Sequence, residues 1–230
     1  MKKIISMSVW GNNPRYIEGA KRQIELASEF YPDWQVYLYT DDITKYQYQE
    51  NLKLISCSGN NGVFWRFYPL FESDSNITIV RDSDGRITKR EAMAIQEWLE
   101  SDRTFHIYRD HEAHFQFPII ACAFGLKGRL SEKLLLEMKN FEQAPFYYTN
   151  DQVYLRDHIF PAVSNNALIH TMESGWFGET RNQLVNPYSF CGNGYDEYDM
   201  PLYPGTLAEC KNFDPKSVDA KYRFDKGIMR

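Results

Sequence analysis

The sequence predicts an α/β domain with a mostly parallel central sheet covered by helices. Apolar runs of strand length alternate with segments in which apolar residues recur every three or four positions. Clusters of Gly, Pro, Asn and Asp separate these runs. Strands that are connected through helices run parallel, and the helices then cover both faces of the sheet. We therefore expect a single α/β domain over residues 1–172, and the 43% of apolar residues can supply its core.

The elements of this domain follow from periodicity and from turn and capping residues. Asn12, Asn13 and Pro14 predict a turn that opens the first helix, because proline suits the first helical turn. Thr88 and Glu91 match a capping box at the start of a later helix. Strands are expected over residues 4–10, 34–40, 52–57, 77–80, 104–108, 119–125 and 167–171. Helices are expected over residues 14–30, 63–71 with an interruption near Pro69, 88–99, 131–141 and 151–159.

The pattern of strands and helices ends after residue 172. Gly, Pro, Asn, Tyr and Asp dominate residues 174–215, which predicts an irregular segment. We expect this C-terminal extension, residues 173–230, to pack on the domain or to close over a site.

Charge and cysteine usage exclude several classes of protein. The net charge of −5 comes from basic and acidic residues that are mixed along the chain, which argues against a nucleic-acid partner or an anionic membrane surface. The four cysteines are far apart and predict neither a zinc site nor a disulfide framework. The first apolar run is too short for a signal peptide, and no later run could span a bilayer. We therefore expect a cytoplasmic protein without an integral membrane segment.

Asp82-Ser83-Asp84 is the strongest functional feature of the sequence. It directly follows an apolar strand, and ligands of open α/β sheets bind outside the carboxyl ends of the strands. Two carboxylates at positions i and i+2 can bind one Mn²⁺ or Mg²⁺, which also accepts phosphate oxygens. Such a cation would neutralise charge on a departing diphosphate. The alternative is that both carboxylates only pair with Arg81 and Arg86 in a loop.

The motif and its surroundings resemble small GT-A glycosyltransferases of bacterial polysaccharide clusters and large DNA viruses. The resemblance rests on the first strand and on residues 62–67, 81–86, 105–111, 118–122 and 150–152, and it extends to about residue 172. It implies a GT-A (Rossmann-like) fold and a metal-dependent transfer of sugar from a nucleotide-diphosphate donor, with a UDP-sugar favoured. The acceptor would be a hydroxyl group of a glycan or glycoconjugate.

The resemblance also implies roles for individual residues. The first strand and its loop would bind the base and ribose of the donor, and the acidic end of the second strand would assist them. The residues at the matching positions are Ser8, Trp10, Asn12, Arg15 and Asp41. His170 stands where many GT-A enzymes have a third metal ligand beside the two aspartates. Each also has an ordinary interpretation: turn residues, a solvated arginine, or a histidine satisfied within the core.

Asp151 is the candidate catalytic residue. Thr149 and Gln152 match a capping box, which places Asp151 in the first turn of a helix, where the helix dipole keeps a carboxylate ionised. Such a carboxylate could take the proton of an acceptor hydroxyl or orient the acceptor, although acidic residues also occur there for helix stability alone. The cationic partners expected for the diphosphate are Arg66, Arg81 and Arg86.

Residues 109–114, with the sequence RDHEAH, are rich in hydrogen-bonding groups and are assigned to acceptor recognition. His111 and His114 are spaced like a metal pair, but the sequence offers no third ligand nearby. His106 lies on an apolar strand like His170, but without the positional match.

Two other functions compete with glycosyl transfer. Asp82-Ser83-Asp84-Gly85 after a strand is similar to the motif of haloacid-dehalogenase phosphatases, whose first Asp attacks phosphate. In this sequence Arg86 replaces the usual Thr, Arg81 precedes the motif, and three strands come before it. A non-enzymatic carbohydrate-binding or surface protein is the other alternative, because the 16% of aromatic residues could stack on sugar rings.

Overall fold

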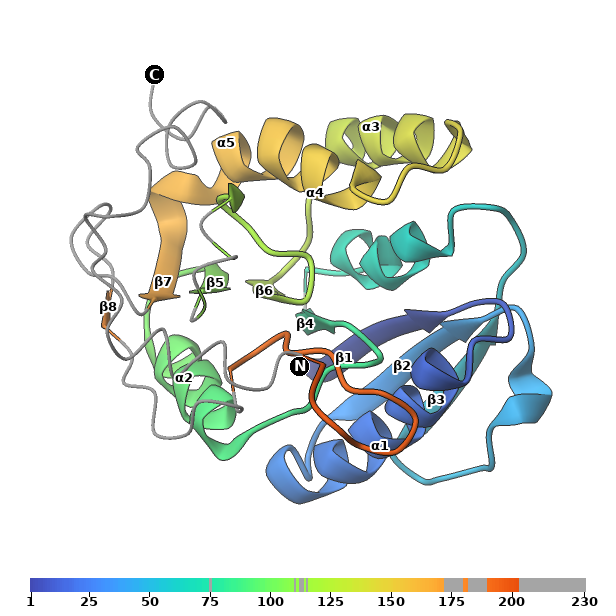
Figure 1. The fold of residues 1–230 in the computed structure, drawn as a ribbon. Helices are drawn as coiled ribbons and strands as arrows, with labels where there is room; N and C mark the ends of the chain where they lie inside the picture. The colour runs from blue at the N-terminus through green and yellow to red at the C-terminus, as the bar shows by residue number, and fades with distance from the viewer. Residues whose placement is uncertain are drawn as a thin grey trace.

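The computed structural model describes residues 1–74, 76–109, 111, 114, 116–171, 180–181 and 190–202. Its centre is an eight-stranded sheet with the strand order β3-β2-β1-β4-β6-β5-β7-β8 (Figure 1). Neighbouring strands are parallel, except that β6 runs antiparallel to both β4 and β5. The expected α/β architecture with a mostly parallel sheet is confirmed. In the described part of the chain, no helix has the length and apolar character to cross a membrane.

Six of the seven expected strands lie within two residues of their predicted bounds. The strands are β1 (Lys2–Val9), β2 (Gln35–Thr40), β3 (Leu52–Ser56), β4 (Asn76–Arg81), β5 (Phe105–Arg109), β6 (Ala123–Lys127), β7 (Ala167–Thr171) and the short β8 (Thr180–Arg181). β6 is the exception, because the expected strand over 119–125 begins only at Ala123. Ile119 and Ala121 are buried but lie outside the strand. Their main chain is paired with the side-chain amide of Gln152, which donates to the carbonyl of Ile119 at 3.1 Å and accepts from the N–H of Ala121 at 3.0 Å. The apolar run therefore reflects burial rather than strand pairing.

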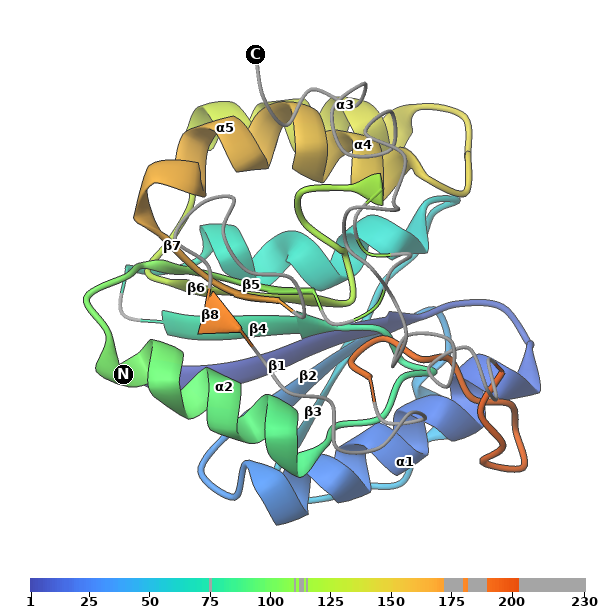
Figure 2. The ribbon, with the colours of Figure 1, turned by 60° about the vertical axis from the view of Figure 1, so that its left-hand side comes forward.

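Helices cover both faces of the sheet, as the side view in Figure 2 shows. One face carries α1 (Pro14–Phe30) and α2 (Lys89–Glu100), and the opposite face carries η2 (Gly62–Phe71) beneath a layer of further helices. That layer consists of α3 (Glu132–Gln143), α4 (Asn150–Tyr154), η4 (Leu155–Ile159) and α5 (Phe160–Val163). Two short 3-10 turns, η1 (Ile43–Lys45) and η5 (Ser164–Asn166), complete the described helical elements.

Two helical segments differ from their expected form. η2 is a 3-10 helix that runs through Pro69 without the expected interruption. The helix expected over residues 151–159 is divided into α4, the π-helical η4 and the short α5. Both segments pack in the core between the sheet and α3, where tertiary contacts outweigh local helix preference.

Side-chain caps begin three helices, whereas Thr149 makes no side-chain cap at α4, so the capping box expected there is not formed. Asn13, Thr88 and Ser131 each accept a hydrogen bond from a main-chain N–H two or three residues further on. The capping box expected at α2 is only half formed, because the carboxylate of Glu91 pairs with Arg81 instead of returning to the cap.

Alternation along β4 decides which side chains reach the candidate site. Ile77 and Ile79 pack in the core beneath α1 and α2, whereas Val80 packs in the core with η2. Because successive strand residues point to opposite faces, Arg81 points to the same face as Ile77 and Ile79, and Asp82 points to the same face as Val80. The two neighbours therefore leave β4 in opposite directions.

Candidate functional site

A pocket of about 500 Å³ opens at the carboxyl ends of β1 and β4. This volume lies within the range of small-molecule sites, and its position is where open α/β sheets bind ligands. Its walls come from the β1–α1 loop, η2, the loop after β4, the α3–α4 loop and the segment after residue 190. The lining residues are Ser8, Val9, Trp10, Gly11, Asn12, Asn13, Arg15, Tyr16, Val63, Arg66, Asp82, Ser83, Asp84, Phe146, Tyr148, Thr149, Asp151, Gln152, Gly192 and Gly194.

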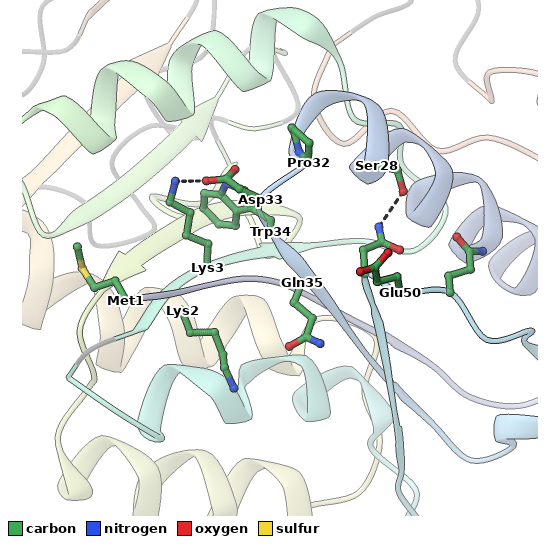
Figure 3. A pocket seen from close by; sticks show the side chains of 11 residues that line it. Met1, Lys2, Lys3, Ser28, Pro32, Asp33, Trp34, Gln35 and Glu50 are labelled. Atoms are coloured by element: carbon green, nitrogen blue, oxygen red, sulfur yellow. Dashed lines mark hydrogen bonds and ion pairs between the residues drawn. The ribbon is translucent and has the colours of Figure 1, made fainter.

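A larger hollow of about 640 Å³ lies at the other end of the sheet, beside the amino ends of β1 and β2 (Figure 3). Two pairs of its polar side chains contact each other: Lys3 donates to Asp33 at 2.5 Å, and Asn51 donates to Ser28 at 2.8 Å. Because it faces away from the carboxyl ends of the strands, we assign the candidate site to the smaller pocket.

Three carboxylates and two arginines meet in this pocket. The guanidinium of Arg66 pairs with Oδ1 of Asp82 through Nη1 and with Oδ2 of Asp151 through Nη2, the latter at 2.8 Å. Arg15 pairs with Oδ2 of Asp84. Arg66, Asp84 and Asp151 are each at most 6% exposed, while 37% of the side chain of Asp82 is exposed. The acidic groups therefore outnumber the basic ones at the floor of the pocket.

Burial and charge pull on these groups in opposite directions. Burial raises the pKa of Asp84, Asp82 raises it further, and Arg15 opposes both effects. Burial likewise raises the pKa of Asp151, while the guanidinium of Arg66 opposes the rise. Burial alone would lower the pKa of Arg66, but Asp82 and Asp151 outweigh it and leave that pKa raised. Arg66 therefore remains a cation, and a further cation beside Asp82 and Asp84 would relieve their mutual repulsion.

α1 holds the main chain of the Asp82–Asp84 loop through two residues that the sequence analysis missed. A Cβ on Gly19 would lie 2.6 Å from the carbonyl oxygen of Ser83, so only glycine permits this approach. The amide of Gln23 donates to the carbonyl of Asp82 at 3.0 Å and accepts from the N–H of Ile87 at 2.9 Å. A glycine and a glutamine on the buried face of an amphipathic helix were the signal that could have identified this support.

Substitution of Gly19 by alanine tests that packing. Alanine is intrinsically the better helix former, by about 1 kcal/mol. The clash with the Ser83 carbonyl should nevertheless lower the free energy of unfolding by roughly 1–3 kcal/mol, the usual cost of overpacking. Urea denaturation measures the change, and Glu18→Ala, at an exposed position of the same helix, should change stability by less than about 0.5 kcal/mol. A stabilised Gly19→Ala protein would contradict the close approach.

The segment 190–202 lies against the same loop. The N–H of Tyr195 donates to the carbonyl of Asp84 at 2.9 Å, and a Cβ on Gly194 would lie 2.6 Å from the guanidinium of Arg15. Gly192 and Gly194 contribute to the pocket wall. Apart from residues 180–181, the rest of the expected C-terminal extension, residues 173–179, 182–189 and 203–230, lies outside the described residues, so its role stays a prediction.

The residues expected to bind base and ribose lie around the pocket. Ser8, Trp10, Asn12 and Arg15 all line it. The hydroxyl of Ser8 is buried and has no hydrogen-bond partner in the described structure. Asp41 is outside the lining, and its Oδ2 accepts a hydrogen bond from the N–H of Gly11 at 2.8 Å. Asp41 thus orients the β1–α1 loop.

Two of the three arginines assigned to the diphosphate are directed elsewhere. Arg81 is 2% exposed and donates from Nε to Glu91 at 2.5 Å, on the α2 face of the sheet. Arg86 donates to Asp199 at 2.6 Å and to the carbonyl of Gly85 at 2.5 Å. The structure corrects both expectations, because strand alternation turns Arg81 into the core and the segment 190–202 holds Arg86. Of these three arginines, only Arg66 lines the pocket.

His170 is not brought to the aspartates. Its Nδ1 lies 2.9 Å from Nε2 of His106, its Nε2 lies 3.0 Å from Glu97, and the residue is 2% exposed on the α2 side of β7. Among the residues that the structure describes, no group of three or more His, Cys, Asp or Glu could hold a metal ion. This corrects the expectation of a third ligand. Two carboxylates still fit Mg²⁺ or Mn²⁺, because such ions are often held by one or two carboxylates together with substrate phosphates.

The region assigned to acceptor recognition is largely covered. Arg109, His111 and His114 are each at most 6% exposed, and the ring of His111 stacks on Phe190 with the centroids 4.1 Å apart. Residues 110, 112 and 113 lie outside the described part of the chain. The three buried side chains are therefore not presented to an acceptor in this structure.

The buried histidines predict a pH dependence of stability. Burial lowers the pKa of His114 to about 3, below the ordinary value near 6.5 of the unfolded chain. Between these values the unfolded state binds more protons, so the free energy of unfolding should fall as the pH drops below 6.5. At pH 5 the loss from this one residue should be about 2 kcal/mol relative to pH 7. Urea denaturation at both pH values should show a smaller loss for His114→Gln, and an equal loss would refute the prediction.

Comparisons with known proteins give only distant structural similarities. No protein-family model matches the chain, and no curated protein matches it in sequence. Similar solved structures include a glycosyltransferase involved in glycosylation of the major capsid of PBCV-1, with 13% identity, coverage of 75% of this chain and 83% of that chain, and a TM-score of 0.44. An active-site mutant of LgtC has 9% identity, coverage of 91% and 95%, and a TM-score of 0.49. The 4-diphosphocytidyl-2C-methyl-D-erythritol synthase of Anaerococcus prevotii has 10% identity, coverage of 80% and 91%, and a TM-score of 0.47. Similarities at these values support no conclusion by themselves, so the function is inferred from the site.

Proposed function

We propose that this protein is a metal-dependent glycosyltransferase of the GT-A type. It would transfer a sugar from a nucleotide-diphosphate donor, with a UDP-sugar favoured, to a hydroxyl group of a glycan or glycoconjugate. The observation that carries the proposal is the convergence of Asp82, Asp84, Asp151 and Arg66 in one pocket at the carboxyl ends of β1 and β4. These groups come from three separate elements: Arg66 from η2, Asp82 and Asp84 from the loop after β4, and Asp151 from α4. Charges that only paired with their neighbours in a surface loop would not require this convergence.

Asp82 and Asp84 would hold Mn²⁺ or Mg²⁺ against the donor phosphates. Among the described residues, Arg66 contacts only Oδ1 of Asp82, which leaves Oδ2 for a cation. When bound, the ion would supply neutralisation of the charge that develops on the departing diphosphate.

Arg66 and Arg15 would bind the diphosphate. Each lies beside a carboxylate of the pocket, and a planar guanidinium can bind phosphate oxygens bidentately. Arg66 also contacts Asp151 at 2.8 Å, so the same side chain links the donor half of the pocket to the candidate catalytic carboxylate. Trp10, Ser8 and Asn12 would bind the base and ribose from the β1–α1 loop.

Asp151 would accept the proton of the acceptor hydroxyl or orient that hydroxyl. Arg66 and the N–H of Gln152 each hydrogen-bond its carboxylate at 2.8 Å, which fixes the direction of the group. Burial raises the pKa of Asp151 and makes its carboxylate a stronger base than an exposed one.

A thermal-shift screen of nucleoside diphosphates with and without Mn²⁺ tests the proposal. UDP at 100 times its Kd should stabilise the protein by about 2.7 kcal/mol in the presence of Mn²⁺. Asp82→Asn should lose the part of this stabilisation by UDP that depends on Mn²⁺. If no nucleoside diphosphate stabilises the wild-type protein with Mn²⁺, the donor site is refuted.

Turnover separates this proposal from a non-enzymatic carbohydrate-binding protein. A glycosyltransferase should release UDP slowly from its UDP-sugar when water replaces the acceptor, and the release should require Mn²⁺. A binding protein would bind sugars without releasing nucleotide from any of a panel of UDP-sugars.

A further inference from the structure

Three consecutive aromatic side chains stand exposed at the mouth of the pocket. Phe146, Tyr147 and Tyr148, in the loop between α3 and α4, are 53%, 69% and 81% exposed. Phe146 and Tyr148 line the pocket, and Tyr147 between them does not. Single exposed aromatics are ordinary, but adjacent ones continuous with a pocket mark a binding surface.

The main chain beneath these rings is held in place. The buried amide of Asn61 donates to the carbonyls of Glu142 at 2.9 Å and Ala144 at 2.7 Å. Asn150 donates from its side chain to the carbonyl of Pro145 at 3.1 Å and from its N–H to the carbonyl of Tyr147 at 3.0 Å. The loop is therefore fixed before a ligand arrives, and binding to its rings requires little further ordering.

The loop that carries these rings leads directly into the helix that carries Asp151. Tyr148 and Thr149 directly precede α4, which carries Asp151 in its first turn. The proposed donor groups, Asp82 and Asp84, come from the loop after β4, and Arg66 contacts both Asp82 and Asp151. An acceptor ring that contacts Phe146 and Tyr148 would therefore occupy the same pocket as Asp151.

We propose that Phe146 and Tyr148 form a stacking platform for the terminal sugar ring of the acceptor glycan. This inference rests on the proposed function, since that function defines the acceptor. The apolar face of a pyranose stacks on an aromatic ring. The proposed platform places acceptor recognition at Phe146 and Tyr148 and not at residues 109–114, whose described side chains are buried.

Saturation-transfer NMR with defined sugars tests the platform. The probes are methyl β-D-galactoside, methyl α-D-glucoside, methyl α-D-mannoside and lactose, each with the wild-type protein, UDP and Mn²⁺. At least one sugar should receive saturation, and Tyr148→Ala should raise its Kd about tenfold, as expected for the loss of one stacked ring. Tyr148→Trp should restore binding. Tyr147→Ala is the matched control from the same loop and should leave the Kd within about twofold, because its ring is outside the pocket lining.

Three outcomes would overturn the platform. The first is that none of the sugars receives saturation, or that Tyr148→Ala leaves their Kd unchanged. The second is that Tyr148→Ala weakens binding of UDP with Mn²⁺ instead, which would make the ring a partner of the donor base. The third is co-sedimentation with phosphatidylcholine vesicles that depends on both Phe146 and Tyr148, without sugar binding. Failure of the proposed function is a separate result, because it appears as absence of stabilisation of the wild-type protein by UDP and Mn²⁺.

Discussion

Asp84→Asn is expected to lower the rate of sugar transfer about 1,000-fold, the upper range for loss of one group that stabilises charge in a transition state. Asparagine keeps the size of the side chain and an oxygen that can still accept from Arg15, but it removes the negative charge that would hold the cation. Asp84 is 6% exposed and burial raises its pKa, so its negative charge is costly in the fold and we expect asparagine to be accommodated there. The measurement is kcat/KM for a UDP-sugar at saturating Mn²⁺, with thermal unfolding to confirm an intact fold.

Asp199→Asn is the matched control for Asp84→Asn. Asp199 is an exposed aspartate of the neighbouring segment and pairs with Arg86 at 2.6 Å. Its φ of 66° suits asparagine, so the substitution should not strain the backbone. Transfer should stay within about twofold of the wild-type rate, as expected for a surface ion pair. Wild-type activity of Asp84→Asn would refute the metal assignment, and an equal loss in Asp199→Asn would attribute the effect to the segment 190–202.

Most of the fold could be predicted because each element carries its own local signal. Pro14 and its cap Asn13 begin α1, and Thr88 and Ser131 begin two further helices, so the boundaries follow from nearby residues alone. The error at 119–125 has a non-local cause. Hydrophobicity reports burial, but the groups that satisfy the backbone of Ile119 belong to Gln152, which no local pattern identifies.

A site residue can be predicted from the sequence where its position at the end of a strand is enough to place it at the pocket. Asp82 follows β4 directly, and its place at the carboxyl edge of the sheet needs only the strand assignment. Arg81 and His170 were misassigned because the face of the sheet, and not the position along it, decides what a strand residue contacts. Ile169 packs in the core with η2, so its neighbour His170 points to the α2 side, toward His106.

The residues that support the site had weaker signals. Gly19 and Gln23 interrupt the apolar face of α1, but only the structure shows that they meet the main chain at Ser83 and Asp82. Asn61 lies in a Gly-Asn-Asn-Gly sequence that is typical of a turn, whereas its buried amide holds the end of α3. Hydrogen bonds between distant segments are the part of the site that local patterns do not encode.

Removal of one partner of the Arg81–Glu91 ion pair is expected to destabilise the fold by about 3–5 kcal/mol. Both side chains are at most 2% exposed, and Arg81 also donates to the carbonyl of Val80 at 2.7 Å. Glu91→Leu would leave the guanidinium buried without its counter-charge, which costs far more than the pair contributes. The loss should reach the segment 190–202 as well, because the thiol of Cys191 lies 3.4 Å from the second carboxylate oxygen of Glu91.

The double variant Arg81→Met with Glu91→Leu separates an unpaired charge from lost packing. Apolar side chains of similar size need no counter-charge, so the double variant should regain most of the stability lost in Glu91→Leu. Urea denaturation of the three proteins gives the coupling between the two positions. The exposed pair of Arg22 and Glu25, at 2.7 Å, provides the contrast, and Glu25→Gln should cost less than about 1 kcal/mol. A double variant as unstable as Glu91→Leu would mean that the geometry of the pair, rather than its charge, stabilises the end of β4 and thereby the loop that carries Asp82 and Asp84.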